Sequence, residues 1–292
     1  MSRKNLKSAA IALTLLASAA GALGQGFLDN FSSSLTLGNY NVYINSTTPT
    51  WGPAFLVTNS PYKWVATGGL NNGGAIAPQP TSSSITVDST LIYHNASFDF
   101  SGVGTALNIS AEFNLAAVSV GGNKLLQLGF LNASTNGMNG NSGIAFTSLR
   151  LTTVGTSGDT FTPQWQTKLA SGSTVTPSLT PNVTLTAGDW YELSGTFVNM
   201  GGGNIQASGF LQDEGKNGAT PGAVVFTFPT TTLTGIADIT SDTAVWAGLR
   251  GFNGDGLNLV GDFGASIVPE PGPAALLALA VAVFLVTRRR KA

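Results

Sequence analysis

Residues Gly188–Gln212, with the sequence GDWYELSGTFVNMGGGNIQASGFLQ, decide the fold predicted for this chain. Apolar and polar side chains alternate from Trp190 to Asn199 and again from Asn204 to Gln212. A period of two is the pattern of a β-strand that buries one face and exposes the other. The glycine-rich gap between the two runs interrupts the pattern as a turn does. We therefore predict two strands here, and the same pattern extends along most of the chain.

Short alternating runs separated by turn residues predict further strands on both sides of this stretch. They are Leu35–Leu37, Tyr40–Ile44, Ser84–Val87, Ala96–Phe100, Leu107–Leu115, Lys124–Asn132, Gly143–Leu151, Thr162–Leu169, Thr184–Thr186, Val224–Phe228, Ala244–Gly251 and Leu257–Ile267. No segment longer than a turn or two has a helical period, except at the two ends of the chain. The predicted fold class is therefore all-β, with one β-sandwich domain over residues 26–267, because a sandwich buries many half-apolar strands.

The composition of residues 26–268 limits the functions that this domain can have. Gly26–Val268 carries six Lys and Arg against thirteen Asp and Glu, a net charge near −7, whereas the whole chain is at −1. Nucleic-acid binding calls for a basic patch, so this balance argues against it. The chain has no cysteine, so it has neither disulfides nor thiolate chemistry. The domain must therefore be stabilised by its own hydrophobic core, and a chain of this length can bury one.

Residues 1–25 have the layout of a secretory signal peptide with an apolar helix. A basic start is followed by the apolar run Ala9–Leu16 and then by small residues up to Gly24. We predict export, with cleavage after Ala22 or Gly24. A retained N-terminal anchor is the alternative.

The segment of residues 268–292 reads VPEPGPAALLALAVAVFLVTRRRKA. Its prolines interrupt any strand or helix that reaches them, and Ala274–Val286 is apolar and uncharged. As a helix this run would span roughly 20 Å, which is short against about 30 Å of hydrocarbon. Cations that stay in the cytoplasm stop translocation, and four cations end the run: Arg288, Arg289, Arg290 and Lys291. We predict a C-terminal transmembrane sorting helix, with an ordinary membrane anchor as the alternative.

This order of a Pro-Glu-Pro motif, an apolar run and a basic end resembles the PEP-CTERM sorting signal of Gram-negative bacteria. In that family an exosortase-type membrane protease cuts at the motif and releases or transfers the mature protein. The resemblance implies the same here, in the inner membrane first and then at the cell surface or in the extracellular matrix. The implied sorting residues are Pro269, Glu270, Pro271, Arg288, Arg289 and Arg290. The resemblance covers under a tenth of the chain and names no ligand.

A second, looser set of residues resembles concanavalin A-like, laminin-G-like jelly rolls. It comprises Phe27–Phe31 and Val260–Phe263 near the two ends of the mature chain, with Gly188–Leu193 and Val245–Gly251 between them. The resemblance implies that the first and last strands lie together and that a hairpin near Met200–Asn204 follows the Gly-x-Trp-Tyr-x-Leu strand. A generic β-sandwich is the alternative.

No motif in the sequence indicates catalysis, and we predict no enzyme activity and no catalytic residue. Jelly-roll glycoside hydrolases commonly place two carboxylates in a Glu-x-Asp-x-x-Glu pattern, which this chain lacks. Asp189 and Glu192 are neighbouring acids, but a strand would direct them to opposite faces. His94 is the single histidine, and no Gly-x-Ser-x-Gly elbow supplies a nucleophile for a triad.

Two weaker candidate sites remain. Asn253 and Asp255 lie in an Asn-Gly-Asp-Gly segment whose oxygen atoms could bind calcium, although such a segment is more typical of a tight hairpin. Trp51 and Trp64 lie in loop-like stretches and are candidate platforms for sugar rings, although tryptophan is usually buried. We predict no required cofactor, and calcium is the one metal that the sequence leaves open.

These observations predict an exported, exosortase-processed surface or matrix protein that is structural or associated with polysaccharide. The richness in Gly, Ser, Thr and Asn and the missing catalytic motifs favour this role. The alternative is a secreted enzyme that degrades polysaccharide, with dispersed catalytic residues on the same scaffold. The expected partners are the exosortase-type protease, the membrane before processing and an extracellular polysaccharide, but not nucleic acid.

Overall fold

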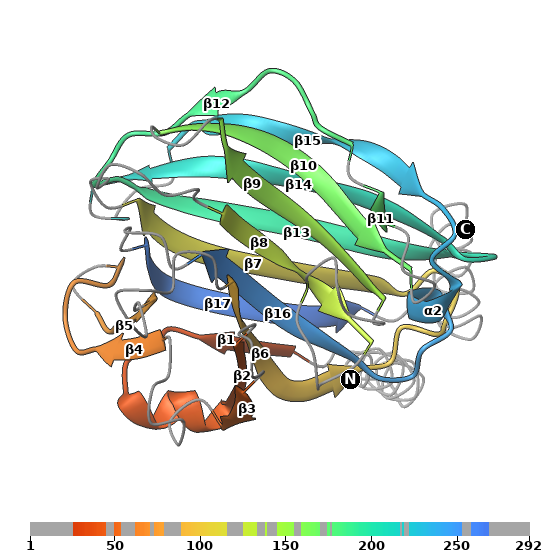
Figure 1. The fold of residues 1–292 in the computed structure, drawn as a ribbon, viewed down its shortest axis with the longest axis horizontal. Helices are drawn as coiled ribbons and strands as arrows, with labels where there is room; N and C mark the ends of the chain where they lie inside the picture. Colours follow the sequence, from red (N-terminus) through yellow and green to blue (C-terminus); the bar gives the residue numbers. More distant parts are fainter. Residues whose placement is uncertain are drawn as a thin grey trace, which may run out of the picture.

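A computed structural model shows two β-sheets packed face to face (Figure 1). It describes residues 26–44, 50–53, 62–70, 73–78, 89–115, 125–132, 138, 145–154, 159–169, 174–175, 177–216, 218, 222–252 and 258–268. The predicted signal helix and the sorting segment from residue 269 onward lie outside these residues. Within the described ranges, no helix is long and apolar enough to cross a membrane.

Sheet A has eight strands, and all of its pairings are antiparallel. Their order is β15-β14-β13-β7-β17-β5-β4, and β1 also pairs with β17. The strands are β1 (Gly26–Asp29), β4 (Tyr62–Val65), β5 (Ala75–Pro78), β7 (Ala106–Leu115), β13 (Trp190–Gly201), β14 (Asn204–Gly215), β15 (Val224–Leu233) and β17 (Asn258–Val268).

Sheet B has nine strands, again antiparallel, in the order β11-β10-β9-β8-β16-β6-β2-β3, with β12 paired to β10. The strands are β2 (Tyr40–Ile44), β3 (Thr50–Pro53), β6 (Ser89–Phe98), β8 (Leu125–Leu131), β9 (Phe146–Thr153), β10 (Thr160–Lys168), β11 (Thr174–Val175), β12 (Val183–Thr184) and β16 (Val245–Phe252). Two short helices, η1 (Ser34–Asn39) and α2 (Ala237–Thr240), complete the described elements.

The core fills the space between the two sheets. Every second residue of β7 is buried, and the same alternation runs along most of β13. The indole of Trp165 on β10 packs edge-on against Phe197 and Phe228 of sheet A, with ring centroids 5.9 and 5.2 Å apart. Such aromatic contacts add about 0.5–1.5 kcal/mol beyond the burial of area. The all-β sandwich predicted from the sequence is therefore confirmed, with its core between the sheets.

The structure also confirms the two pairings that the jelly-roll resemblance implies. The first and last described strands lie side by side, since β1 and β17 pair from Gly26↔Ser266 to Asp29↔Phe263. The strands β13 and β14 form a hairpin. Its turn passes through Gly201, Gly202 and Gly203, each at a positive φ that other residues adopt at a cost.

One predicted strand is wrong and several short strands were not predicted. Leu35–Leu37 belongs to the 3-10 helix η1. The backbone amide of Leu35 is bound by the Ser33 hydroxyl at 3.2 Å, and local bonds of this kind compete with a β-ladder. The four-residue strands β3, β4 and β5 carry too little pattern to be recognised. The predicted strand Ser84–Val87 lies outside the described residues.

Candidate functional site

Charged residues are distributed unequally between the two sheets. The strands of sheet B contain no Asp or Glu, and they contain three cations: Arg150 on β9, Lys168 on β10 and Arg250 on β16. The strands of sheet A contain six Asp and Glu and one Lys. The two sheets therefore have opposite electrostatic character within one domain.

One row of register partners crosses sheet B from edge to edge, which we call the sheet B row. Its members are Ser178, Gln164, Arg150, Gln127, Arg250, Leu91, Tyr43 and Trp51. At the usual spacing of strands the row is about 34 Å long. Gln127 and Arg150 project away from the core, because side chains alternate along a strand and the adjacent Leu128 and Leu149 are core residues. The row therefore places amide and guanidinium groups on the outer face of the sheet.

The centre of the sheet B row is a buried hydrogen-bond network. The Arg250 Nη1 donates to Gln127 Oε1 at 3.1 Å and also to the carbonyl of Met138. The Gln127 Nε2 donates to Ser148 Oγ at 2.7 Å and to Gln166 Oε1 at 2.9 Å. The Ser148 hydroxyl donates in turn to the Gln166 carbonyl at 3.0 Å. Because both ends of the Gln127 amide are bound, its orientation is fixed.

Next to this network the row becomes partly exposed around Arg150. The Arg150 Nε donates to Gln164 Oε1 at 2.6 Å, and Gln164 Nε2 donates to Ser178 Oγ at 2.9 Å. The Thr162 hydroxyl on the same face donates to Asn182 Oδ1 at 3.0 Å. We call this set the Arg150 patch: Arg150, Thr152, Thr162, Gln164, Ser178 and Asn182. It presents hydroxyl, amide and guanidinium groups that are held in place by one another.

The charge of Arg150 is not balanced within the described residues. No described carboxylate forms an ion pair with it, and its one hydrogen bond uses Nε and leaves both terminal nitrogens without a described partner. Burial lowers the pKa of the Arg150 guanidinium, but arginine remains protonated in proteins. A half-buried charge without a counter-ion is costly unless a ligand supplies one.

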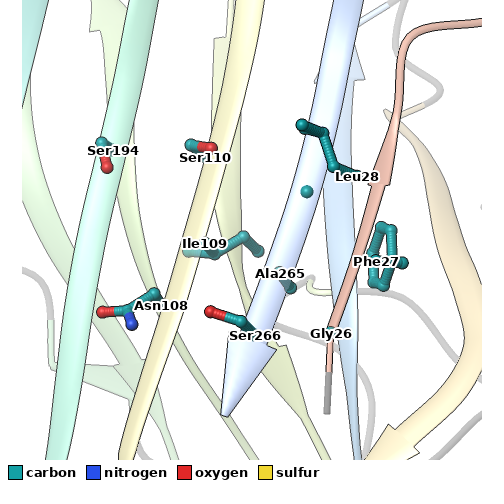
Figure 2. Close-up of a pocket in the computed structure, with 10 residues that line it drawn as sticks. Gly26, Phe27, Leu28, Asn108, Ile109, Ser110, Ser194, Ala265 and Ser266 are labelled. Carbon is teal, nitrogen blue, oxygen red and sulfur yellow. The ribbon is translucent and has the colours of Figure 1, made fainter. Parts of the chain in front are cut away.

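A trough with different chemistry lies on the outer face of sheet A. It has a volume of about 430 Å³, and Figure 2 labels residues that line it. It is lined by Gly26, Phe27 and Leu28 of β1, Gly264, Ala265 and Ser266 of β17, Asn108, Ile109 and Ser110 of β7, and Ser194 of β13. A second hollow of about 230 Å³ continues it across β14 and β15, past Phe210 and Thr227. None of the described residues that line the two hollows is charged.

Carboxyl groups adjoin this trough at one end. Glu112 and Glu192 are register partners on β7 and β13, and Glu214 and Asp262 lie at irregular positions of β14 and β17. Burial and the charges of Asp262, Glu192 and Glu214 raise the pKa of Glu112 to about 7. Glu112 Oε2 is buried and has no hydrogen-bond partner among the described residues. No group of three or more acids or histidines in the described part has the geometry of a metal site.

The structure describes the side chain of one of the two candidate tryptophans, Trp64, and not that of Trp51. Trp64 is half-buried on β4, packs against the core and donates from Nε1 to the Phe31 carbonyl at 2.7 Å. The backbone of Trp51 pairs with Tyr43 at the end of the sheet B row, but its side chain lies outside the described residues. Asn253, Asp255 and the sorting residues from Pro269 to Arg290 also lie outside the described residues.

Comparisons with known proteins add similarity of shape only. No protein-family model matches the chain, and no curated protein matches it. A peanut lectin in complex with a peptide is similar at 10% identity and a TM-score of 0.48, over 84% of this chain and 99% of the lectin. A CBM2 module of the Lactobacillus casei BL23 phage J-1 evolved Dit is similar at 13% identity and a TM-score of 0.45, over 85% of this chain and 99% of the module.

An endo-1,3-beta-glucanase from Streptomyces sioyaensis is similar at 13% identity and a TM-score of 0.44, over 83% of this chain and 95% of the enzyme. Similarity at this level carries no argument about function. The site must therefore be interpreted from its own residues.

Proposed function

We propose that this chain is an exported surface or matrix protein whose β-sandwich binds an extracellular polysaccharide at the Arg150 patch of sheet B, without catalysis. The observation that carries the proposal is the Arg150 patch beside the buried Gln127–Arg250 network. Sugar hydroxyls both donate and accept hydrogen bonds, and side-chain amides, hydroxyls and guanidinium groups match them.

Preorganisation supports binding at this face. Gln164 is held from both sides, by Arg150 at its carbonyl oxygen and by Ser178 at its amide nitrogen. Ordering a mobile polar side chain at an interface costs about 0.5–1.5 kcal/mol. Side chains already fixed in the free protein avoid much of that cost, so a shallow surface can still bind a ligand.

We expect the mature secreted protein to be retained on at least one polymer of a panel that contains cellulose, xylan, dextran, polygalacturonate and alginate. The variant T152W should weaken retention by about tenfold or more, because an indole at Thr152 would cover the Arg150 patch. The matched variant T230W places an indole on the outer face of sheet A, where Thr230 lines the smaller hollow. It should change retention by less than about twofold.

Several outcomes of this assay would contradict the proposal. Retention on no polymer would remove polysaccharide binding, and equal loss in T152W and T230W would remove the assignment to sheet B. Shortening of a retained polymer would support the enzyme alternative. We expect retention to persist in EDTA, whereas its loss would implicate calcium and make Asn253 and Asp255 the first positions to mutate.

We further propose that the tail is processed at its Pro-Glu-Pro motif by an exosortase-type protease. The support is the motif itself, with its apolar run and basic end. The intact mass of the secreted protein should then lack the apolar run and the terminal cations, as well as residues 1–25 or nearly so. Deletion of Arg288, Arg289 and Arg290 should leave the tail uncleaved. A secreted protein that still carries the complete tail would disprove processing.

A further inference from the structure

We propose that the polysaccharide bound at the Arg150 patch is acidic, and that Arg150 binds a carboxylate or sulfate group of the polymer. This inference rests on the proposed function and adds the chemical class of its ligand. It starts from three independent observations: the isolation of Arg150, the geometry of its guanidinium and the distribution of charge between the two sheets.

Within the described residues, the charge of Arg150 has no acidic partner and could be balanced by an anionic ligand. Most half-buried arginines are paired, yet no described carboxylate pairs with this one, and none of the nine strands of its sheet contains an acid. Its only described hydrogen bond goes to a neutral amide oxygen, Gln164 Oε1, at 2.6 Å. A neutral acceptor orients the guanidinium without cancelling its charge. The positive charge therefore remains available to a ligand.

The geometry of Arg150 suits a forked contact with an anionic group. Because Nε is bound to Gln164, the plane of the guanidinium is fixed and the two terminal nitrogens are left for a ligand. Two parallel N–H donors match the two oxygens of a carboxylate or of a sulfate group. Lysine, with a single rotating ammonium group, could supply the charge but not this fork.

A second cation, Arg250, lies in the same row near Arg150. Arg250 lies two strands away from Arg150, with Gln127 between them, at a distance of about 10 Å between backbones. Its charge is directed into the buried network by its bond to Gln127 Oε1. At that distance a cation in a partly buried setting is incompletely screened by salt.

Sheet A has the opposite effect and limits anion binding to one face. Four acids lie together beside the trough on sheet A: Glu112, Glu192, Glu214 and Asp262. A polyanion that approached the trough would meet these carboxylates, and like charges oppose association. The domain would therefore take an acidic polymer on sheet B and leave sheet A free of it.

The test uses two pairs of polymers that share a backbone and differ in charge. The first pair is polygalacturonate and its fully methyl-esterified form, and the second is dextran sulfate and dextran. We expect the mature protein to bind at least one acidic member about tenfold or more tightly than its neutral partner. The first pair reports on carboxylate and the second on sulfate, so the two sources of negative charge are distinguished.

Variants then assign the preference to Arg150. R150Q should reduce binding of the preferred acidic polymer by about tenfold or more, and R150K should recover only part of it. The matched control K216Q removes the same charge from Lys216, an exposed residue in the turn after β14, and should change binding by less than about twofold. Circular dichroism of each variant checks that the domain is folded.

A second measurement needs no variant. Affinity of the unmodified protein for the acidic polymer should fall as salt rises from 50 to 500 mM, roughly in proportion to the screening of surface charge. Equal binding of both members of each pair, or affinity independent of salt, would overturn the acidic ligand and leave polysaccharide binding intact. Equal losses in R150Q and K216Q would overturn the role of Arg150. Binding to no polymer would overturn this inference and the proposed function together.

Discussion

Replacing Gln127 with leucine should lower the free energy of unfolding by about 2–4 kcal/mol. Leucine has nearly the same volume, so the change creates little cavity and mainly removes hydrogen bonds. It would leave Gln166 Oε1 without the donor at 2.9 Å and would take one acceptor from the buried Arg250 guanidinium. A buried cation that loses a partner cannot recover it from water, because Gln127 itself is 0% exposed. The loss should be measured by urea unfolding followed by tryptophan fluorescence.

The matched control for this prediction is Q206L on sheet A. Gln206 lies on the exposed face of β14, and the same substitution there should change the unfolding free energy by less than about 0.5 kcal/mol. Similar losses in Q127L and Q206L would mean that the network contributes nothing beyond a general effect of leucine in a strand. A loss in Q127L alone would show that the buried network stabilises the part of sheet B that carries the Arg150 patch.

The strands of sheet A show how far the sequence alone can predict this fold. In β7 and β13 the burial alternates residue by residue, because one face meets the core and the other meets water. In such strands the alternation of apolar and polar residues in the sequence directly predicts which side chains are buried. The four-residue strand β4 is different, since its place is set by pairing with β5 rather than by its own pattern. Such strands cannot be recognised locally.

The candidate site could not be predicted for a related reason. Gln127 and Arg250 are 123 positions apart in the sequence, and only the order β8-β16 within sheet B makes them neighbours. In the sequence each looks like a single polar interruption of an apolar strand. Glu112 and Glu192 likewise become neighbours only through the pairing of β7 with β13. A search for acids close together in the sequence, such as Asp189 with Glu192, finds the wrong pairs.

The variant E112Q should be more stable than the unmodified protein at pH 8 and equally stable near pH 4. The pKa of the Glu112 carboxyl is raised from 4.5 to about 7, first by burial and then by the charges of Asp262, Glu192 and Glu214. Between these two pH values the folded state binds more protons than the unfolded state, so stability falls as the pH rises. The contribution is fully present below about pH 4.5 and is lost by about pH 7. Glutamine is neutral throughout and removes this loss.

The expected gain of E112Q at pH 8 is on the order of 2 kcal/mol, after allowance for the partial exposure of Glu112. Urea unfolding at intervals between pH 4 and pH 8 would measure the difference between the two proteins at each pH. This difference isolates Glu112 from other groups that titrate in the range, such as His94, whose pKa burial lowers. A constant difference across the range would contradict the raised pKa.

The matched variant D99N should give the opposite sign. Hydrogen bonds from the hydroxyl and the backbone amide of Ser101, at 2.6 and 3.0 Å, lower the pKa of Asp99. Its charged form is therefore favoured by folding, and D99N should lose stability at neutral pH rather than gain it. A gain in both variants would indicate simple relief of the negative charge of the domain. A gain in E112Q with a loss in D99N would locate the repulsion in the carboxyl cluster of sheet A, which is the face that an acidic polymer is expected to avoid.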